Sequence, residues 1–249
     1  MSIKRYSYTD VKCPREVVLL QSTGCSWGHC TFCDYQNDKS MSAAAAAKLN
    51  RQILRLVTGK SGVLQIIDSA SFSELPMETL LDVLAVCKEK NIHKVILEQH
   101  WSYRSGFWVL SDLFESRGVE CLFLGGIESF NPQIRGGLFN KGMGRDGPEE
   151  IRRYFQWVNL LCGVKGQSLE GVLEDIHIGL ELFERVILNI FITNSSSAQR
   201  DEELIAALYA HPEFPLLKAN SKIEILEYGN PLSDGTLGGI GYGEEETIK

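Results

Sequence analysis

The segment GCSWGHCTFC carries three cysteines, Cys25, Cys30 and Cys33, within nine residues. Three thiolates on a glycine-containing loop can bind one iron–sulfur cluster and leave its fourth iron without a protein ligand. An iron left open in this way can bind a cofactor. The segment also allows a zinc site of Cys3His type, with His29 or Cys13 as the fourth ligand. Zinc sites commonly pair two separate groups of ligands, and the lack of a second pair in the sequence favours the cluster.

Further polar candidates stand where apolar runs end. Glu98 and Glu128 each follow such a run, which makes them candidates for a cofactor site, with a solvated surface position as the alternative. Lys141 and Arg145 lie in a glycine-rich segment and could bind a carboxylate or a phosphate, again with a surface position as the alternative. Polar and aromatic residues suited to hold a planar base and a sugar follow one apolar run, and two more follow the last such run and could line the same binding site. They are His100, Trp101, Tyr103, Arg104, Glu227 and Tyr228.

The elements that must position these residues alternate regularly along the chain. Short β-rich runs predict strands at Val17–Gln21, Val63–Ile67, Lys94–Leu97, Val119–Leu124, Val158–Cys162, Val186–Ile192 and Lys222–Leu226. Helical patterns lie between them at Met41–Val57, Met77–Lys90, Trp108–Ser116, Glu149–Gln156, Leu169–Phe183 and Asp201–Tyr209. This order predicts an α/β fold, a partial (β/α)6 TIM-like barrel of parallel strands whose chemistry lies in the loops after the strands.

Composition bounds the possible partners. The chain has 249 residues and a net charge of −7, the wrong sign for a protein that follows a phosphate backbone. No apolar run approaches the ~20 residues of a membrane span, and the start MSIKRYSYTD lacks a signal-peptide core. We therefore expect a cytoplasmic protein with a small-molecule partner. Free thiols are then the rule, so Cys87, Cys121 and Cys162 are predicted to lie in the core.

The cysteine segment and four later loops resemble the radical S-adenosylmethionine (SAM) superfamily. The superfamily commonly spaces its cysteines C-x3-C-x2-C, whereas this chain reads C-x4-C-x2-C, with the usual aromatic residue at Phe32. Similar loop segments follow the second, third and fifth predicted strands, at IDSASF, LEQHWSYR and CGVKGQ. The fourth loop is the better match: GGIESFN, then Ile134-Arg135, then Asn140-Lys141-Gly142. The resemblance covers roughly residues 15 to 195.

The resemblance implies a [4Fe–4S] cluster and SAM as cofactors, with a reduced flavodoxin or ferredoxin as electron donor. It places Cys25, Cys30 and Cys33 on the cluster and gives catalytic roles to Glu98 and Lys141. The residues it implies around SAM are Phe32, Asp68, Ser69, Ala70, Ser71, Glu98, Glu128, Lys165 and Asn189. His100, Tyr103, Arg104, Arg145, Glu227 and Tyr228 remain for the substrate.

The substrate class follows from size and composition. The chain is expected to form a single domain, with a core at about residues 15–228 and a glycine-rich tail at 229–249, and it lacks the appended domains of many superfamily members. Among small members it most resembles the queuine lyases of bacterial queuosine salvage, which cleave the N-glycosidic bond of a queuosine nucleotide. A tRNA-modifying enzyme of the elongator-like or methylthiotransferase-like branch is the enzymatic alternative. A zinc-stapled binding module is the non-enzymatic one.

Overall fold

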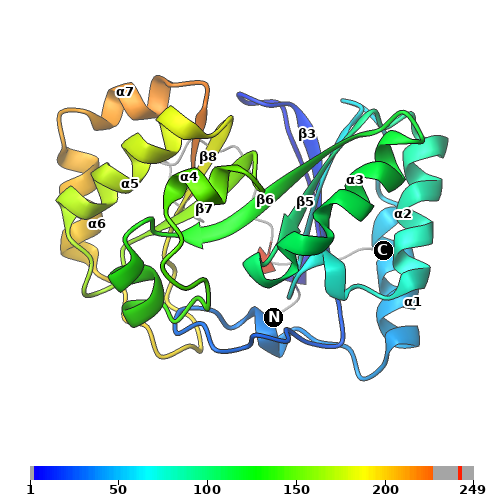
Figure 1. Cartoon of the computed structure of the whole chain (residues 1–249), viewed down its shortest axis with the longest axis horizontal. Coiled ribbons are helices and arrows are strands. Elements are labelled where there is room, and N and C mark those ends of the chain that lie inside the picture. Colours follow the sequence, from blue (N-terminus) through cyan, green and yellow to red (C-terminus); the bar gives the residue numbers. More distant parts are fainter. Residues whose placement is uncertain (1–2, 227–240, 243–249) are drawn as a thin grey trace. The chain divides into compact units, whose positions relative to one another are not determined.

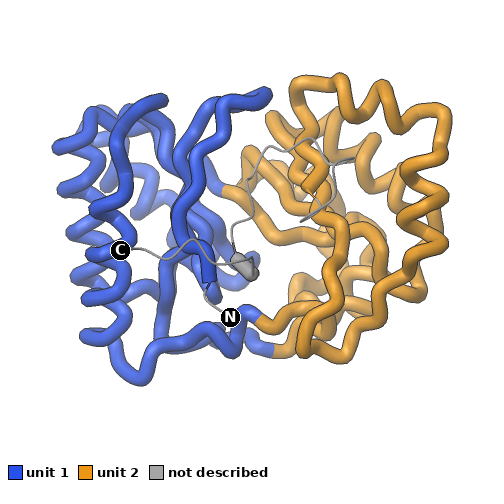
Figure 2. The backbone as a smooth tube through the Cα atoms, turned by 180° about the vertical axis from the view of Figure 1, so that it is seen from behind, with its two compact units in different colours: residues 1–28, 35–123, 237–249 blue, residues 29–34, 124–236 orange. Residues whose placement is uncertain are grey.

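The computed structural model describes residues 3–226 and 241–242, which form two compact units (Figure 2). The first unit holds the described residues up to 28, residues 35–123 and residues 241–242. The second unit holds residues 29–34 and 124–226. The unit boundary therefore divides the cysteine segment after Gly28, so that Cys25 belongs to the first unit and Cys30 and Cys33 to the second.

A mostly parallel sheet organises the first unit. Its strands are neighbours in the order β2 (Tyr6–Thr9), β3 (Arg15–Leu20), β4 (Val63–Asp68), β5 (Lys94–Gln99) and β6 (Glu120–Glu128). The strand β2 runs antiparallel to β3, whereas β3, β4 and β5 are parallel. All six residues of β3 are buried, as expected for a parallel strand covered on both faces. Two short strands, β1 (Ile3–Lys4) and β10 (Gly241–Tyr242), form a separate antiparallel pair.

Helices follow the strands of the first unit. They are α1 (Ala43–Leu54), α2 (Met77–Glu89) and α3 (Phe107–Glu115), with short turns η1 (Tyr35–Asn37), η2 (Phe72–Glu74) and η3 (Trp101–Gly106). The helix α1 begins at Ser42, whose side chain accepts a hydrogen bond from the Ala45 amide, and it packs beside α2 and against β3 (Figure 1). From α1 the buried Asn50 bonds both backbone groups of Gln21 at 2.8 Å and so fixes the start of the cysteine segment.

The second unit repeats the βα pattern. The strand β6 continues into it from Leu124 and is followed by the parallel strands β7 (Trp157–Cys162), β8 (Arg185–Ile190) and β9 (Ile223–Leu226). The helical elements are a π-helical turn η4 (Ile134–Leu138), α4 (Pro148–Arg152), α5 (Leu169–Leu182), α6 (Glu202–Ala210) and α7 (Phe214–Ala219). The helix α5 packs on β7 and β8 (Figure 1), and side-chain caps from Ser168 and Asp201 start α5 and α6.

The predicted fold class is confirmed. Each predicted strand and helix is present, in the predicted order of six βα pairs and a closing strand, and the sequence analysis missed β1, β2, β10 and α7. Cys87, Cys121 and Cys162 are buried as predicted. No helix among the described residues is long and apolar enough to cross a membrane. The single-domain assignment stays a prediction, and the tail at 229–249 lies outside the described residues except for Gly241 and Tyr242.

Candidate active site

The first half of the cysteine loop follows β3 in the first unit. Gly24 and Gly28 have positive φ angles, 137° and 59°, which favour glycine and let the chain turn around Cys25. The Gly28 amide lies 3.3 Å from the Cys25 sulfur and donates to it. Cys25 is partly exposed, unlike the buried core cysteines. The loop therefore presents an accessible thiol whose sulfur already accepts an N–H group.

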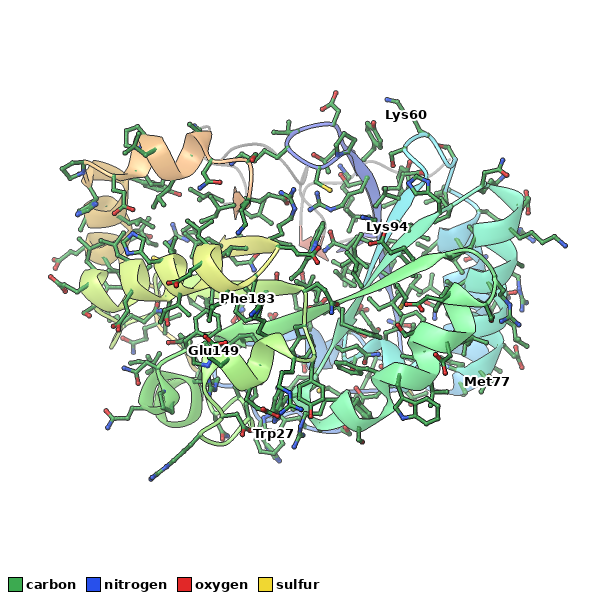
Figure 3. All side chains as sticks on the ribbon, turned by 45° about the horizontal axis from the view of Figure 1, so that its top comes forward. Trp27, Lys60, Met77, Lys94, Glu149 and Phe183 are labelled. Atoms are coloured by element: carbon green, nitrogen blue, oxygen red, sulfur yellow. The ribbon has the colours of Figure 1, made fainter. Side chains whose placement is uncertain are left out.

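Two neighbouring loops contact this half of the cysteine loop. One oxygen of Glu74 accepts hydrogen bonds from the Ser26 amide at 2.7 Å and from the Tyr103 hydroxyl at 2.9 Å. The Ser26 hydroxyl also lies 2.9 Å from the Tyr103 hydroxyl. Trp27 stacks on His100 with 6.1 Å between ring centroids. In Figure 3 Trp27 marks the end of the first unit where its parallel strands finish, and Lys60 and Lys94 mark the end where β4 and β5 begin.

An open cavity lies beside Cys25. Its volume is about 570 Å³, and it is lined by Thr23, Gly24, Cys25, Ser26, Gln36, Lys39 and Glu74. Both a lysine and a carboxylate reach this cavity, so it can accept polar groups of either charge. Neither Glu74 nor Lys39 was a candidate in the sequence analysis. Glu74 could have been found there, because it is a further carboxylate in the loop that follows β4, the strand that ends at Asp68.

The loops after β4 and β5 are tied to each other. The Ser71 hydroxyl donates to Gln99 at 2.7 Å and accepts from the His100 amide at 3.0 Å. Asp68, at the end of β4, is buried, and its Oδ2 atom has no hydrogen-bond partner among the described residues. Burial raises the pKa of Asp68 well above its usual range. A buried carboxyl oxygen of this kind is suited to a hydrogen bond with a polar group of a ligand.

The second half of the cysteine loop is anchored in the second unit. The Thr31 amide and hydroxyl donate to the carbonyls of Phe139 and Leu138 at 3.1 and 2.7 Å. The Asn194 side chain donates to the Phe32 carbonyl at 2.9 Å, and the Phe32 and Phe139 rings meet edge to face. These contacts flank Cys30 and Cys33, so hydrogen bonds and a ring contact with residues far along the chain hold this part of the loop.

A buried ion pair lies at the end of β6. The Lys141 ammonium is 2.9 Å from the Glu128 carboxylate, and their side chains are 13% and 8% exposed. Burial opposes the charge on Lys141, but Glu128 and the thiol groups of Cys30 and Cys33 outweigh it and raise the pKa of the lysine. The lysine nitrogen also lies 5.5 Å from the centre of the Phe32 ring. The structure thus brings together three residues that the sequence analysis assigned to cofactor or catalysis.

Backbone geometry aims Glu128 into this pair. Glu128 has a φ of +66°, in the left-handed region, and the β6–β7 register shifts between Gly126 and Glu128. Bulges of this kind redirect a side chain beside active sites. The two residues after Glu128 are held by Asp175, which accepts hydrogen bonds from the Ser129 hydroxyl at 2.6 Å and the Phe130 amide at 2.7 Å. Burial raises the pKa of Asp175 to about 6.

The remaining predicted residues lie in mixed settings. Glu98 and Asn189 are partly buried on β5 and β8, and Ala70 is partly exposed. Arg104 lies over the Trp101 ring at 4.4 Å and donates to the Trp101 carbonyl. Arg145 and Lys165 are exposed. Glu227 and Tyr228 lie outside the described residues. Their assignment to cofactor or substrate stays a prediction.

The donor set fits an iron–sulfur cluster. Cys25, Cys30 and Cys33 are all partly exposed, and a buried lysine lies where it offsets the charge of two of the thiolates. Among the described residues, no three His, Cys, Asp or Glu side chains are close enough to hold one metal ion. The assignment of the cluster ligands therefore rests on donor chemistry and spacing.

Comparison with known proteins gives the family. No protein-family model matches the chain, and no curated protein matches it. Among solved structures, Streptococcus suis SuiB shares the fold, at 14% identity and a TM-score of 0.55 over 87% of this chain and 50% of its own. A queuine lyase from Clostridium spiroforme, solved bound to SAM and queuine, is 37% identical with a TM-score of 0.85. That match covers 92% of this chain and 97% of the other. The chain therefore belongs to the queuine lyase family of radical SAM enzymes.

Proposed function

We propose that this protein releases queuine from queuosine 5′-phosphate by cleaving the bond between the base and the ribose. The observation that carries the proposal is the 37% identity, over nearly the whole of both chains, to a queuine lyase bound to SAM and queuine. The site supports it with polar and aromatic groups, among them His100 and Trp27, gathered where the strands of the first unit end. Arg145 is exposed in the loop after β6 and is our candidate for the substrate phosphate.

We assign Cys25, Cys30 and Cys33 to a [4Fe–4S] cluster. When bound, the cluster supplies the electron that splits SAM into methionine and the 5′-deoxyadenosyl radical, which takes a hydrogen from the substrate. The protein's part is to hold the thiols in place and to keep water away from the reacting groups. The hydrogen bonds that anchor Thr31 and Phe32, from the Thr31 hydroxyl to the Leu138 carbonyl and from the Asn194 side chain to the Phe32 carbonyl, support the first of these tasks.

SAM is assigned to the ends of the parallel strands. The backbone of Ser69, Ala70 and Ser71 is proposed to meet its amino group, beside the buried Asp68. Glu98 and Glu128 are proposed for its ribose hydroxyls or amine, and Lys141 orients Glu128 by fixing one of its oxygens at 2.9 Å. We also assign catalytic roles to Glu98 and Lys141, in contact with the reacting groups of SAM or substrate. Phe32, Lys165 and Asn189 complete the proposed cofactor site.

We assign the substrate to the loop after β5 and to the last residues of the core. His100, Tyr103 and Arg104 belong to this set, with Glu227 and Tyr228. The structure already engages the hydroxyl of Tyr103 with Ser26 and Glu74, and the guanidinium of Arg104 with Trp101. His100 is partly buried and stacked on Trp27, which favours it as the residue that meets a planar base.

We place the reaction in the cytoplasm, with a reduced flavodoxin or ferredoxin as electron donor. Support comes from the seven cysteines, all of which are free thiols, as expected in a reducing compartment. The net charge of −7 argues against intact tRNA as the substrate.

The test is anaerobic reconstitution followed by a product assay. We expect about four irons per chain. With dithionite, SAM and queuosine 5′-phosphate, we expect equal appearance of 5′-deoxyadenosine and free queuine. Zinc without iron would overturn the cluster assignment. Cleavage of SAM with tRNA but not with the nucleotide would overturn the substrate assignment in favour of a tRNA-modifying enzyme.

Matched cysteine variants test the ligand set. Cys33→Ala is expected to lose most of the iron, whereas Cys13→Ala is expected to keep it, because Cys13 lies outside the loop and is similarly partly exposed. Loss of metal from Cys13→Ala as well would indicate a site with four protein ligands, as in the zinc alternative.

A further inference from the structure

We infer that Glu74 and Tyr103 are positioning residues that brace the cysteine loop at Ser26 and thereby hold Cys25 ready to bind the cluster. The inference rests on the proposed function for the cluster, and it gives two residues of the βα loops a role in the cofactor site. Glu74 lies at the end of η2, after β4, and Tyr103 lies in η3, after β5. Ser26 directly follows the first proposed ligand.

The contacts form a closed set of three groups. Glu74 accepts from the Ser26 amide at 2.7 Å and from the Tyr103 hydroxyl at 2.9 Å, both through the same carboxylate oxygen. The Ser26 and Tyr103 hydroxyls are 2.9 Å apart, which closes the triangle. Hydrogen bonds to a carboxylate are shorter and stronger than bonds between neutral groups. Loss of the carboxylate therefore removes two of the three bonds at once.

The braced position matters because of the loop's length. Four residues, Ser26 to His29, separate the first two cysteines, one more than the common spacing of the superfamily. A longer connection has more conformations to lose when the thiols converge on a cluster. The structure restrains three of the four residues from outside the loop: Ser26 through Glu74 and Tyr103, Trp27 through its stack on His100, and His29 through its carbonyl, which accepts from the Asn140 side chain at 3.0 Å. The fourth, Gly28, bonds the Cys25 sulfur.

Tyr103 is suited to this role at neutral pH. Burial, together with its bond to Glu74, raises the pKa of the Tyr103 hydroxyl, so the group stays protonated and remains a donor. The Tyr103 hydroxyl contacts both Ser26 and Glu74 within the protein. A tyrosine whose only role was to bind the substrate would not need these two contacts. The two roles make different predictions for the cluster-free protein, in which no substrate or cofactor is bound.

The experiment compares Glu74→Ala, Glu74→Gln and Tyr103→Phe with the wild type. Two rates are measured: release of iron from the reconstituted protein to a chelator, and alkylation of Cys25 in the cluster-free protein by iodoacetamide, resolved by mass spectrometry. Glu74→Ala is expected to raise both rates about tenfold, and Tyr103→Phe severalfold. Glu74→Gln keeps an acceptor oxygen and is expected to stay within about threefold of the wild type. The KM for the nucleotide is expected to be unchanged in the two Glu74 variants.

Tyr6→Phe is the matched control. The Tyr6 hydroxyl donates to the buried Glu16 at 2.8 Å, so this variant removes the same kind of bond at a site away from the cysteine loop. It is expected to leave both rates unchanged. Equal rates in Glu74→Ala and the wild type would overturn the inference while leaving the proposed function intact. A raised KM in Tyr103→Phe with unchanged rates would also overturn it, in favour of a substrate contact. A wild type that binds no iron would overturn the proposed function and the inference together.

Discussion

Lys141 and Glu128 concentrate several constraints in one pair of side chains. Both are nearly buried, they lie 2.9 Å apart, and the lysine is close to the ring of Phe32. A buried ion pair contributes little net stability, but removal of one partner leaves the other charge buried and unpaired. We therefore interpret the pair as holding the Glu128 carboxylate in a fixed direction. Its effect on the free energy of unfolding is expected to become measurable when one partner is removed.

Lys141→Met is expected to lower the free energy of unfolding by about 3 kcal/mol, because Glu128 is left buried without its partner. Glu128 raises the pKa of Lys141 in the folded protein. The stability that the ion pair contributes to the wild type is therefore fully present below the pKa of a lysine in the unfolded chain, and it is lost only as the pH rises through the higher pKa of Lys141 in the folded protein. Urea denaturation of the cluster-free protein at neutral pH measures the loss.

The control for Lys141→Met is Arg153→Ala, which breaks an exposed pair with Glu150 whose side chains are 70% and 37% exposed. Such pairs contribute at most ~0.5 kcal/mol. A loss of that small size in Lys141→Met as well would contradict the view that Glu128 depends on its partner.

Gly126 lies against the ion pair of Glu128 and Lys141, where there is no room for a side chain. A Cβ atom at this position would lie 2.9 Å from both the Glu128 oxygen and the Lys141 nitrogen. Gly126→Ala is therefore expected to displace the pair and to weaken SAM binding by about tenfold or more, with a smaller effect on folding. Gly136→Ala, where a Cβ would meet nothing within 4 Å, is the control. Calorimetric titration of the reconstituted proteins with SAM compares them, and equal affinities would rule out a role for the pair in SAM binding.

At the scale of elements, the loop after β6 depends on the helix α5. Asp175 on α5 holds Ser129 and Phe130, the two residues that follow Glu128. Burial raises the pKa of this carboxyl from 3.8 to about 6, which means that the folded protein binds its proton more tightly than the unfolded chain does. Its contribution to stability is therefore present in full below about pH 4 and is lost as the pH rises through 6.

Asp175→Asn is expected to remove this pH dependence. Relative to the variant, the wild type should lose about 2 kcal/mol of unfolding free energy between pH 4 and pH 7. Urea denaturation of both proteins at the two pH values measures the difference, in which the contributions of the other carboxylates cancel. A difference that stays constant with pH would show that Asp175 titrates as an ordinary carboxyl.

Much of this architecture is readable from the sequence. The parallel strands and their helices follow from alternating apolar runs, and Cys87, Cys121 and Cys162 follow from their apolar surroundings. Two elements carry too little pattern to be found: β2 has only the four residues YSYT, and α7 has six with a proline near its start. Hydrogen bonds between loops cannot be read in this way either. Ser26 and Glu74 are 48 residues apart, and no local periodicity connects them.

At the scale of the whole molecule, charge discriminates between substrates. The net charge of −7 opposes association with a polyanion such as tRNA, whereas a mononucleotide needs only one or two local cations. We expect no saturable binding of intact tRNA at 150 mM salt, and at lower salt only weak binding whose log K changes little with log salt. Filter binding over a salt series measures it. A steep negative slope would indicate a basic surface that tracks a nucleic-acid backbone, and an RNA substrate would then take precedence.

The small strand β2 has a practical consequence. The strand β2 pairs with one edge of β3. Without β2, the backbone N–H and C=O groups along that edge of β3, whose six residues are all buried, would lack partners. Arg5, just before β2, adds a 2.6 Å ion pair with Asp38. An uncovered apolar edge strand is a template for aggregation. Truncation past Thr9 is therefore expected to promote aggregation, because it would open the edge of β3, a strand whose six residues are all buried, to intermolecular pairing.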